Sequence, residues 1–440
     1  MAKSYRPYLP EQDFLLPPSL REWLPENHLA YFVSDVIESL DLSAMDAVNG
    51  DEERGQPPYD PRMMTKVLMY GYCVGVFSSR RLERRLAEDV GFRVLAAGNA
   101  PNFRTISDFR KLHLATLAGL FEAVLKIALE AGAMKLGRVA LDGTKMKANA
   151  SKHKAMSYGR MKEKERQLRA EVRRLLAQAE AADAAEDAHY GVDRRGDELP
   201  AELQRRETRL KKIGEAKRAL EERARQQADK ERKSRAEVKQ AKPAAKDQYS
   251  FTDPESRLMK GSEGWVQGYN AQAAVEPGLQ LIVGQSVTSA ANDKEQIEPM
   301  MQVIERQSGQ RPAARLADSG YCSEKNLEYL ETTHQSEGHP TEAYIATGRQ
   351  KHDEYRPPCP RGPLPASATR VERMKRKLQT QAGRAVYAAR KTMVEPVFGQ
   401  IKEARGFRRF LLRGLTKVRG EWALVCLTHN ILKLHRLCYA

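Results

Sequence analysis

The sequence has few cysteines, and they lack the spacing that zinc sites and disulfide frameworks require. The 440 residues include five cysteines, an odd number, and no C-x-x-C pair. Structural zinc sites and disulfide-dependent secreted domains both need cysteines in pairs. The pattern therefore predicts a protein of the reducing cytoplasm; the five cysteines are Cys73, Cys322, Cys359, Cys426 and Cys438.

Long apolar runs are also missing. A membrane-spanning helix needs roughly 20 consecutive apolar residues, and no stretch of this chain approaches that length. The first residues, MAKSYRPYLPEQDF, contain no apolar segment of the kind that directs secretion. Both absences predict a cytoplasmic protein without a membrane partner.

Acidic residues are too few to balance the basic ones. Lys and Arg number 74 and Asp and Glu 58, which gives a formal net charge of +16 and a pI near 9.5. Residues 370–440 hold 17 basic and 4 acidic side chains, and residues 151–250 hold 27 and 19. Basic charge gathered in stretches predicts nucleic acid as the partner. The alternative, that these are only solvated helix faces, stays open.

Residues 1–132 form the first predicted domain. Apolar residues recur at helical spacing in four stretches, about 19–40, 61–76, 81–94 and 105–131. Gly132 is a plausible stop. We expect a helical N-terminal DNA-binding domain, and a plain helical scaffold is the open alternative.

Residues 151–248 have a different composition, rich in Ala, Glu, Lys, Arg and Gln. Apolar residues recur there at sevens, first as Met161, Leu168 and Leu175 and later as Leu203 and Leu210. The stretch from Gly191 to Pro200 interrupts the pattern. This periodicity predicts an antiparallel coiled-coil hairpin inserted into another domain.

The remaining residues, 133–150 and 249–440, alternate between strand and helix patterns. Short apolar runs near residues 137–146, 313–318 and 343–347 predict buried strands. Residues 265–276 alternate with a period of two, and a Pro277-Gly278 turn leads to a further strand at 279–287, which predicts a hairpin. The order of elements predicts a mixed α/β domain with a helical, basic C-terminus.

Two of the predicted strands end in a lone acid, Asp142 in VALDGTK and Asp318 in RLADSGY. If the strands are adjacent, their carboxylates meet at one end of the sheet, and a divalent cation relieves the repulsion between them. Oxygen ligands of this kind suit Mg²⁺ or Mn²⁺. The alternative is that each Asp only caps the turn after its strand. Asp253 and Asp293 are expected to serve as turn or helix-start residues.

Several phrases of the sequence resemble bacterial insertion-sequence transposases of the DDE type. Tyr387-Ala388-Ala389-Arg390, followed by Glu395 and Lys402, resembles the Tyr-Arg-Glu-Lys signature of that family. LDGTKMKANASKHK, LADSGYCSEKN and VEPVFGQIK are similar to its blocks around the first, second and third acids. FRTISDFRK is similar to part of its helical domain. The resemblance covers nearly the whole chain.

The resemblance implies a ribonuclease H-like catalytic domain with Asp142, Asp318 and Glu395 as catalytic residues and metal ligands. Two Mg²⁺ (or Mn²⁺) ions, ~4 Å apart, would then promote cleavage and strand transfer at the terminal inverted repeats of an insertion sequence. It implies as partners double-stranded DNA, from the element's ends and the target, and a second copy of the chain, with the protein on the bacterial nucleoid.

The resemblance also assigns DNA-phosphate contacts to Tyr387, Arg390 and Lys402. The signature has three residues between its Arg and Glu, whereas this chain has four, so Lys391 is a second candidate for the role of Arg390. The basic tail adds further expected DNA contacts, namely Arg405, Arg408 and Arg409. The aromatic residues Phe407 and Phe410 within that tail are equally compatible with a helix packed on the core.

Two other functions remain open at this point. One is a ribonuclease H-like nuclease that cuts DNA without joining it, and the other is a non-catalytic DNA-binding descendant. The complete set of three acids disfavours the second, and the large helical domain with its long insertion disfavours a minimal nuclease.

Overall fold

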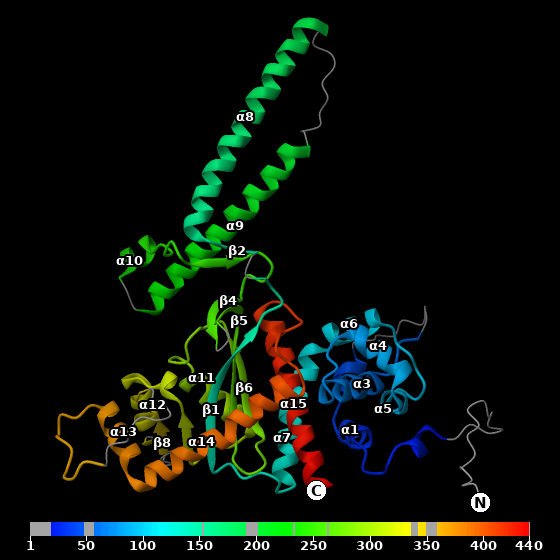
Figure 1. Ribbon diagram of the computed structural model, residues 1–440, viewed down its shortest axis with the longest axis vertical. Helices are drawn as coiled ribbons and strands as arrows, with labels where there is room; N and C mark the ends of the chain where they lie inside the picture. The colour runs from blue at the N-terminus through cyan, green and yellow to red at the C-terminus, as the bar shows by residue number, and fades with distance from the viewer. Residues whose placement is uncertain are drawn as a thin grey trace, which may run out of the picture.

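The structure, a computed structural model, describes residues 19–47, 57–151, 154–190, 201–231, 234–261, 264–335, 342–348 and 359–439. A group of short N-terminal helices lies beside a mixed sheet covered by helices, and two long helices project upwards from the top end of the sheet (Figure 1). Mixed α/β is therefore confirmed as the fold class.

The N-terminal helices are shorter and more numerous than the sequence predicts. The third expected helix is divided at Asp89, whose carboxylate accepts hydrogen bonds from the N–H groups of Gly91 and Phe92 and so starts a new helix. The fourth is divided at His113. The elements are η1 (Leu20–Trp23), α1 (Leu29–Glu38), α2 (Ser43–Asp46), α3 (Pro61–Cys73), α4 (Ser79–Glu88), α5 (Val90–Leu95), α6 (Phe103–Leu112) and α7 (Leu114–Glu130).

One pair of these helices meets the length and hydropathy required to cross a membrane. No single helix among the described residues does so, but α6 and α7 together do, with a bend of 68° between them. One face of α7 is buried in the protein core through Leu117, Phe121 and Val124.

The sheet has an antiparallel half and a parallel half. Strand β5 (Gly264–Val275) pairs antiparallel with β1 (Arg138–Lys147), with β4 (Arg257–Gly261) and with β6 (Ile282–Thr288). On its other edge β1 pairs in parallel with β7 (Ala314–Ala317), and β7 pairs in parallel with β8 (Glu342–Ile345). The predicted hairpin is confirmed, and Glu276 closes its turn by accepting hydrogen bonds from Gly278 and Leu281.

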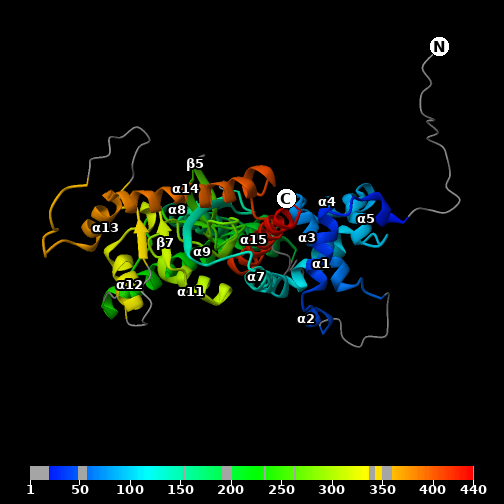
Figure 2. The same ribbon diagram turned by 90° about the horizontal axis from the view of Figure 1, so that it is seen from below.

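Helices cover both faces of this sheet. Helix α14 (Gln381–Gly399) lies along one face, whereas α11 (Ile297–Ser308), α7 and α15 (Leu415–Cys438) lie on the other (Figure 2). Helices α12 (Glu324–Gln335) and α13 (Arg370–Gln379) flank the parallel edge. One continuous hydrophobic core joins the sheet to the N-terminal helices, and Trp422 of α15 is fully buried within it.

The two projecting helices are α8 (Tyr158–Tyr190) and α9 (Ala201–Lys230). Met161 and Leu168 pack against Ile213 and Leu220. Glu165 pairs with Lys217, and Glu171 pairs with Arg206. Residue numbers that rise along α8 therefore face residue numbers that fall along α9, so the two helices are antiparallel. The expected connection at residues 191–200 lies outside the described residues.

Short elements attach this pair to the sheet. Strands β2 (Ala155–Ser157) and β3 (Gln248–Ser250) form a two-stranded antiparallel ribbon at its base, and α10 (Arg235–Gln240) packs on α9. The supercoil of a coiled coil remains a prediction.

The C-terminal segment contains a proline inside a helix and two buried aromatic side chains. Pro396 neither begins nor ends a helix, because α14 continues through it and is followed by the π-helical turn η4 (Gln400–Ala404). Phe407 and Phe410 lie in an irregular segment before α15, at 1% and 0% exposure. The aromatic side chains of the basic tail therefore pack in the core and are not free to stack on DNA.

Candidate active site

The two acids predicted from strand ends lie on adjacent strands. Strands β1 and β7 run in parallel with Leu141 opposite Ala317, so the residues that follow, Asp142 and Asp318, leave the paired region at the same level. One detail of the prediction is wrong, because β1 does not end at Asp142. It continues to Lys147, since β5 still pairs with it after β7 has ended.

Asp142 is largely buried beside an arginine. Its Oδ1 accepts a hydrogen bond from the N–H of Gly143 at 2.8 Å, and its Oδ2 lies 3.1 Å from Nη1 of Arg390. Burial raises the pKa of Asp142 above its ordinary value and Asp318 raises it further, although Arg390 acts in the opposite direction. The site thus holds negative charge that a cation would stabilise.

Asp318 also serves the turn that follows its strand. Its Oδ1 accepts a hydrogen bond from the N–H of Gly320 at 2.8 Å and begins the short 3₁₀ turn η3 (Ser319–Tyr321). Asp318 therefore caps the turn after its strand, as the alternative interpretation expects, and it also lies beside Asp142. Tyr321 is fully buried here, and burial, Asp293, Asp142 and Asp318 all raise the pKa of its hydroxyl.

Helix α14 brings the signature residues Tyr387 and Arg390 to these acids. Burial raises the pKa of Tyr387, Arg390 lowers it, and Asp318 and Asp142 raise it again, which places the phenol among all three groups. Burial lowers the pKa of Arg390, but Asp142 and Tyr387 outweigh this effect and the net shift is upward. Lys391, the second candidate for the role of Arg390, is exposed.

The third predicted acid is not assembled with the other two. Glu395 lies on α14 five residues after Arg390, about 140° further around the helix, and its side chain is exposed. Among the described residues, no group of three or more His, Cys, Asp or Glu side chains is close enough to hold a metal ion. Lys402 lies further along, in η4, and is half-buried.

A further acid, Asp293, lies at the same end of the sheet. Its Oδ1 accepts hydrogen bonds from Asn270 at 2.6 Å and Gln272 at 2.7 Å, and its Oδ2 lies 3.5 Å from Nζ of Lys145. It does not start a helix, because Gln296 caps α11. Its carbonyl accepts a hydrogen bond from the N–H of Gln296 at 3.0 Å, so Asp293 is a turn residue, one of the two roles expected from the sequence.

The sequence contained a signal for this position. Asn270 and Gln272 stand two apart in the strand pattern, so they share a face, and both are buried at 0% and 1% exposure. Two buried amides on one face need a polar partner. Gln272 also accepts a hydrogen bond from the hydroxyl of Tyr321, which links Asp293 to the turn that carries Asp318.

Asp253 is a turn residue, as expected, and also a buried carboxylate. Its carbonyl accepts hydrogen bonds from the N–H and the hydroxyl of Ser256. Its Oδ1 accepts from the hydroxyl of Tyr269 at 2.7 Å and the N–H of Gly414 at 3.3 Å. These contacts join the base of the α8–α9 pair to the C-terminal segment.

The three arginines expected to contact DNA have different surroundings. Arg405 is only 6% exposed and donates hydrogen bonds to the hydroxyl of Thr428 at 2.8 Å and the carbonyl of Val425 at 2.9 Å. Its guanidinium is committed to the core, so the expectation of a DNA contact does not fit this structure. Arg408 and Arg409 are exposed, and Arg408 pairs with Glu403.

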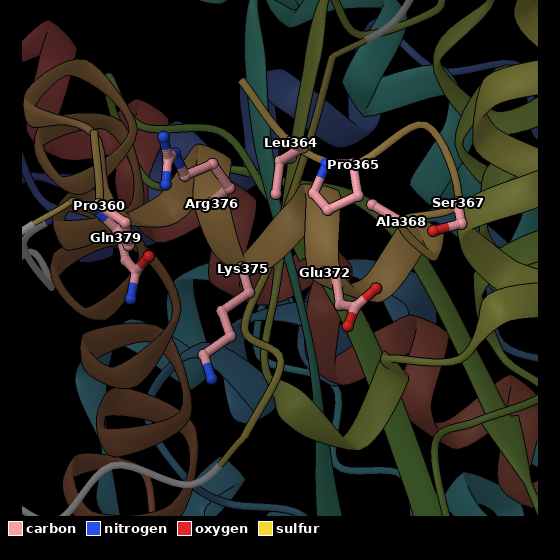
Figure 3. A pocket seen from close by; sticks show the side chains of 9 residues that line it. All are labelled: Pro360, Leu364, Pro365, Ser367, Ala368, Glu372, Lys375, Arg376 and Gln379. Atoms are coloured by element: carbon pink, nitrogen blue, oxygen red, sulfur yellow. The ribbon is translucent and has the colours of Figure 1, made fainter. Parts of the chain in front are cut away.

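A shallow pocket lies away from these acids, on α13 and the loop before it (Figure 3). Lys375, Arg376 and Glu372 line it with apolar neighbours such as Leu364 and Pro365. Its lining includes none of the predicted acids or signature residues, so the pocket does not mark the candidate active site.

Comparison with known proteins gives two matches, both to transposase families. A transposase domain (DUF772) matches residues 18–112, which cover the helices from η1 to α6. A transposase DDE domain matches residues 365–435, which contain Tyr387, Arg390, Glu395 and Lys402. No curated protein and no solved structure matches the chain. One match covers the N-terminal helices and the other covers α14, and together they support an insertion-sequence DDE transposase, an enzyme that acts on DNA.

Proposed function

We propose that this transposase cleaves DNA at the terminal inverted repeats of an insertion sequence and joins the ends to target DNA with the help of a divalent metal. The observation that carries the proposal is the meeting of Asp142, Asp318 and Arg390 at one end of the sheet, in a chain whose families are transposases. The two acids come from β1 and the turn after β7, and the arginine comes from the helix that the DDE family covers.

The sheet supports a ribonuclease H-like domain. The strands lie in the order β6, β5, β1, β7 and β8, with β5 antiparallel to its neighbours and β7 and β8 parallel to β1. This mixed arrangement, with an acid on the central strand and another after the adjacent parallel strand, is consistent with that fold. The boundaries expected from the sequence, 1–132, 151–248 and the remainder, complete the proposed domain organisation.

The residues at the site fit a divalent cation. Burial and the neighbouring Asp318 raise the pKa of Asp142, so a positive charge between the two carboxylates would be stabilised. Asp142 and Asp318 would hold Mg²⁺ or Mn²⁺, with Glu395 as the third ligand implied by the family resemblance. When bound, the two ions expected would activate an attacking oxygen and stabilise the leaving one.

The chain's own residues position the DNA. Arg390 presents a planar fork of donors suited to a phosphate, and Tyr387 lies beside it. Lys391, Lys402, Arg408 and Arg409 would extend this contact along the backbone of the duplex. The charge of residues 370–440 supports such a path, because phosphate neutralisation supplies most of the affinity of basic proteins for DNA.

The assembly and location of the protein are part of the same proposal. Two DNA ends must be brought together for transposition, so we expect at least a dimer on DNA, without a membrane partner and in the bacterial cytoplasm. The antiparallel helices α8 and α9 are a candidate coiled-coil arm for gripping a second DNA end or a second subunit.

Strand transfer by the purified full-length protein tests this proposal. A labelled duplex with the element's terminal repeat is incubated with Mg²⁺ and the wild type, Asp142→Asn or Asp318→Asn. Asp35→Asn, an exposed acid on α1, is the matched control. We expect joined products from the wild type and the control only. Cleavage without joining would favour a nuclease, and DNA binding without cleavage a non-catalytic descendant.

A further inference from the structure

Helix α14 has a weak point next to its predicted acid. Pro396 lies inside the helix, one residue after Glu395. Proline has no backbone N–H, so it cannot donate to the carbonyl four residues earlier, which belongs to Thr392. The residue before a proline is also disfavoured in helical conformation. Both effects act in the helical turn that contains Glu395.

A side chain from the β5–β6 turn replaces the missing donor. Nε2 of Gln280 donates a hydrogen bond to the carbonyl oxygen of Thr392 at 2.8 Å. Oε1 of Gln280 accepts one from Nζ of Lys433 at 2.7 Å. Because a lysine only donates and a carbonyl only accepts, these two partners fix the orientation of the amide. Gln280 therefore supplies the N–H that Pro396 lacks.

The backbone of the same residue supports the helix beyond the proline. The carbonyl of Gln280 accepts a hydrogen bond from Nε2 of His429 at 3.0 Å, and Nδ1 of His429 lies 2.9 Å from the Gln400 amide. Burial, aided by Arg405, lowers the pKa of His429 to about 3, so the imidazole is neutral and accepts at Nδ1. The atom of Gln400 at this distance is Oε1, so a hydrogen bond to the neutral imidazole requires the amide to be turned with its NH₂ group towards Nδ1. The turn thus contacts α14 directly before Pro396, and it reaches Gln400, after the proline, through His429 of α15.

The backbone conformation of Gln280 indicates that a glutamine side chain, and not a glycine, is needed at this position. Its φ is +61°, in the left-handed region that glycine adopts at lower cost. A glutamine at such a position is explained by the two hydrogen bonds that its amide makes.

We propose that Gln280 is a positioning residue for the transposition reaction, which holds α14 continuous across Pro396 and thereby sets the position of Glu395. The proposal rests on the proposed function, since only that function gives Glu395 its part in catalysis.

Two variants remove the donor in different ways. Gln280→Gly removes the amide and relieves the backbone, and Gln280→Glu keeps an acceptor for Lys433 but offers no donor to Thr392. We expect both to lower the rate of strand transfer about tenfold to a hundredfold, with an unchanged Kd for terminal-repeat DNA. Gln280→Gly should keep its melting temperature within about 5 °C of the wild type, whereas a merely structural role would lower melting temperature and rate together.

A second substitution provides the rescue. Pro396→Ala restores a backbone N–H that can donate to Thr392, so Gln280 is no longer required. We expect the double variant Gln280→Gly/Pro396→Ala to recover most of the wild-type rate. Wild-type rates in both single variants, or a double variant no faster than Gln280→Gly, would overturn the proposal.

Hydrogen exchange separates this proposal from the proposed function. The amides of residues 394, 395 and 397–400 should exchange faster in Gln280→Gly and return to the wild-type rate in the double variant, whether or not the protein joins DNA. If the variants show this exchange pattern but the wild-type protein joins no DNA, the role of Gln280 in keeping α14 continuous is supported. In that case the proposed function fails, and Gln280 has no reaction to serve. Unchanged exchange in Gln280→Gly would overturn the role of Gln280 itself.

Discussion

Arg390 and Asp142 are 248 positions apart in the sequence, yet Nη1 of the arginine lies 3.1 Å from Oδ2 of the aspartate. Their side chains are only 11% and 18% exposed, so solvent screens the pair weakly. The contact joins the signature helix α14 to the central strand β1. In the free protein Arg390 pairs with Asp142. In our proposal it pairs with a DNA phosphate in the complex.

Removing this arginine should destabilise the free protein in a metal-dependent way. Arg390→Gln leaves a largely buried carboxylate without its partner, which typically costs about 3 kcal/mol. We expect Mg²⁺ to recover part of that loss, because a cation would replace the arginine beside Asp142. Urea unfolding with and without Mg²⁺ measures both effects. Arg408→Gln, which breaks an exposed ion pair, is the control and should change little. Equal unfolding free energies for Arg390→Gln and the wild type would contradict the prediction.

Glu421 should make stability fall as pH rises. Its side chain is fully buried and its carboxylate accepts hydrogen bonds from the N–H groups of Leu411 and Leu412, yet burial raises its pKa to about 7. The folded state therefore binds a proton that the unfolded state releases above about pH 4.3. The contribution of Glu421 to stability is complete below that pH and is lost as pH rises through 7, by about 4 kcal/mol at most.

The variant Glu421→Gln isolates this effect. It carries no titrating proton, so its unfolding free energy, measured between pH 5 and 8, should lack the decline assigned to Glu421. The same slope in both proteins would show that the group does not titrate in this range.

Gly143, next to Asp142, should tolerate no side chain. A Cβ atom there would lie 2.6 Å from Oδ1 of Asp293 and 2.3 Å from Nε2 of Gln272. Gly143→Ala should displace these groups and slow strand transfer about a hundredfold. Gly137→Ala is the matched control, because a Cβ at Gly137 meets no atom within 4 Å. Single-turnover rates for the two variants test this, and equal rates would argue against a role for the Asp293 side of the site.

Exposed cations near the signature should contribute to DNA affinity through phosphate contacts. Each of Lys391→Ala and Arg409→Ala should reduce the slope of log K against log salt concentration by about 0.9. Arg405→Leu should instead destabilise the fold, because its guanidinium bonds Thr428 and Val425 in the core. Titration of labelled duplex at several salt concentrations gives the slopes. An unchanged slope for both exposed variants would place the DNA elsewhere.

The sequence was most informative where one local pattern determines one element. The alternation in residues 265–276 and the Pro277-Gly278 turn predicted the hairpin. The short apolar runs before Asp142 and Asp318 predicted two strands, and the structure shows that they are adjacent. Helix divisions were missed because they depend on single caps: Asp89 both ends α4 and begins α5.

Contacts between distant segments were beyond the reach of sequence patterns. The five-residue spacing from Arg390 to Glu395 cast doubt on Arg390, but its contact with Asp142 depends on how α14 packs on the sheet. The sequence placed Arg405 in a basic DNA-binding tail, and only its hydrogen bonds to Thr428 and Val425 of α15 show that it points inward. The continuity of α14 through Pro396 depends on Gln280, which lies 112 positions from the carbonyl it bonds.

The most direct test of the central claim is the joining of a pre-cleaved terminal-repeat end, with a free 3′-hydroxyl, to a supercoiled plasmid. This assay needs no first cut and reports strand transfer alone. The account predicts joined plasmid with Mg²⁺ or Mn²⁺, none with EDTA, and none from Asp142→Asn, Asp318→Asn or Glu395→Gln. Joining that persists in Asp142→Asn and Asp318→Asn would contradict it.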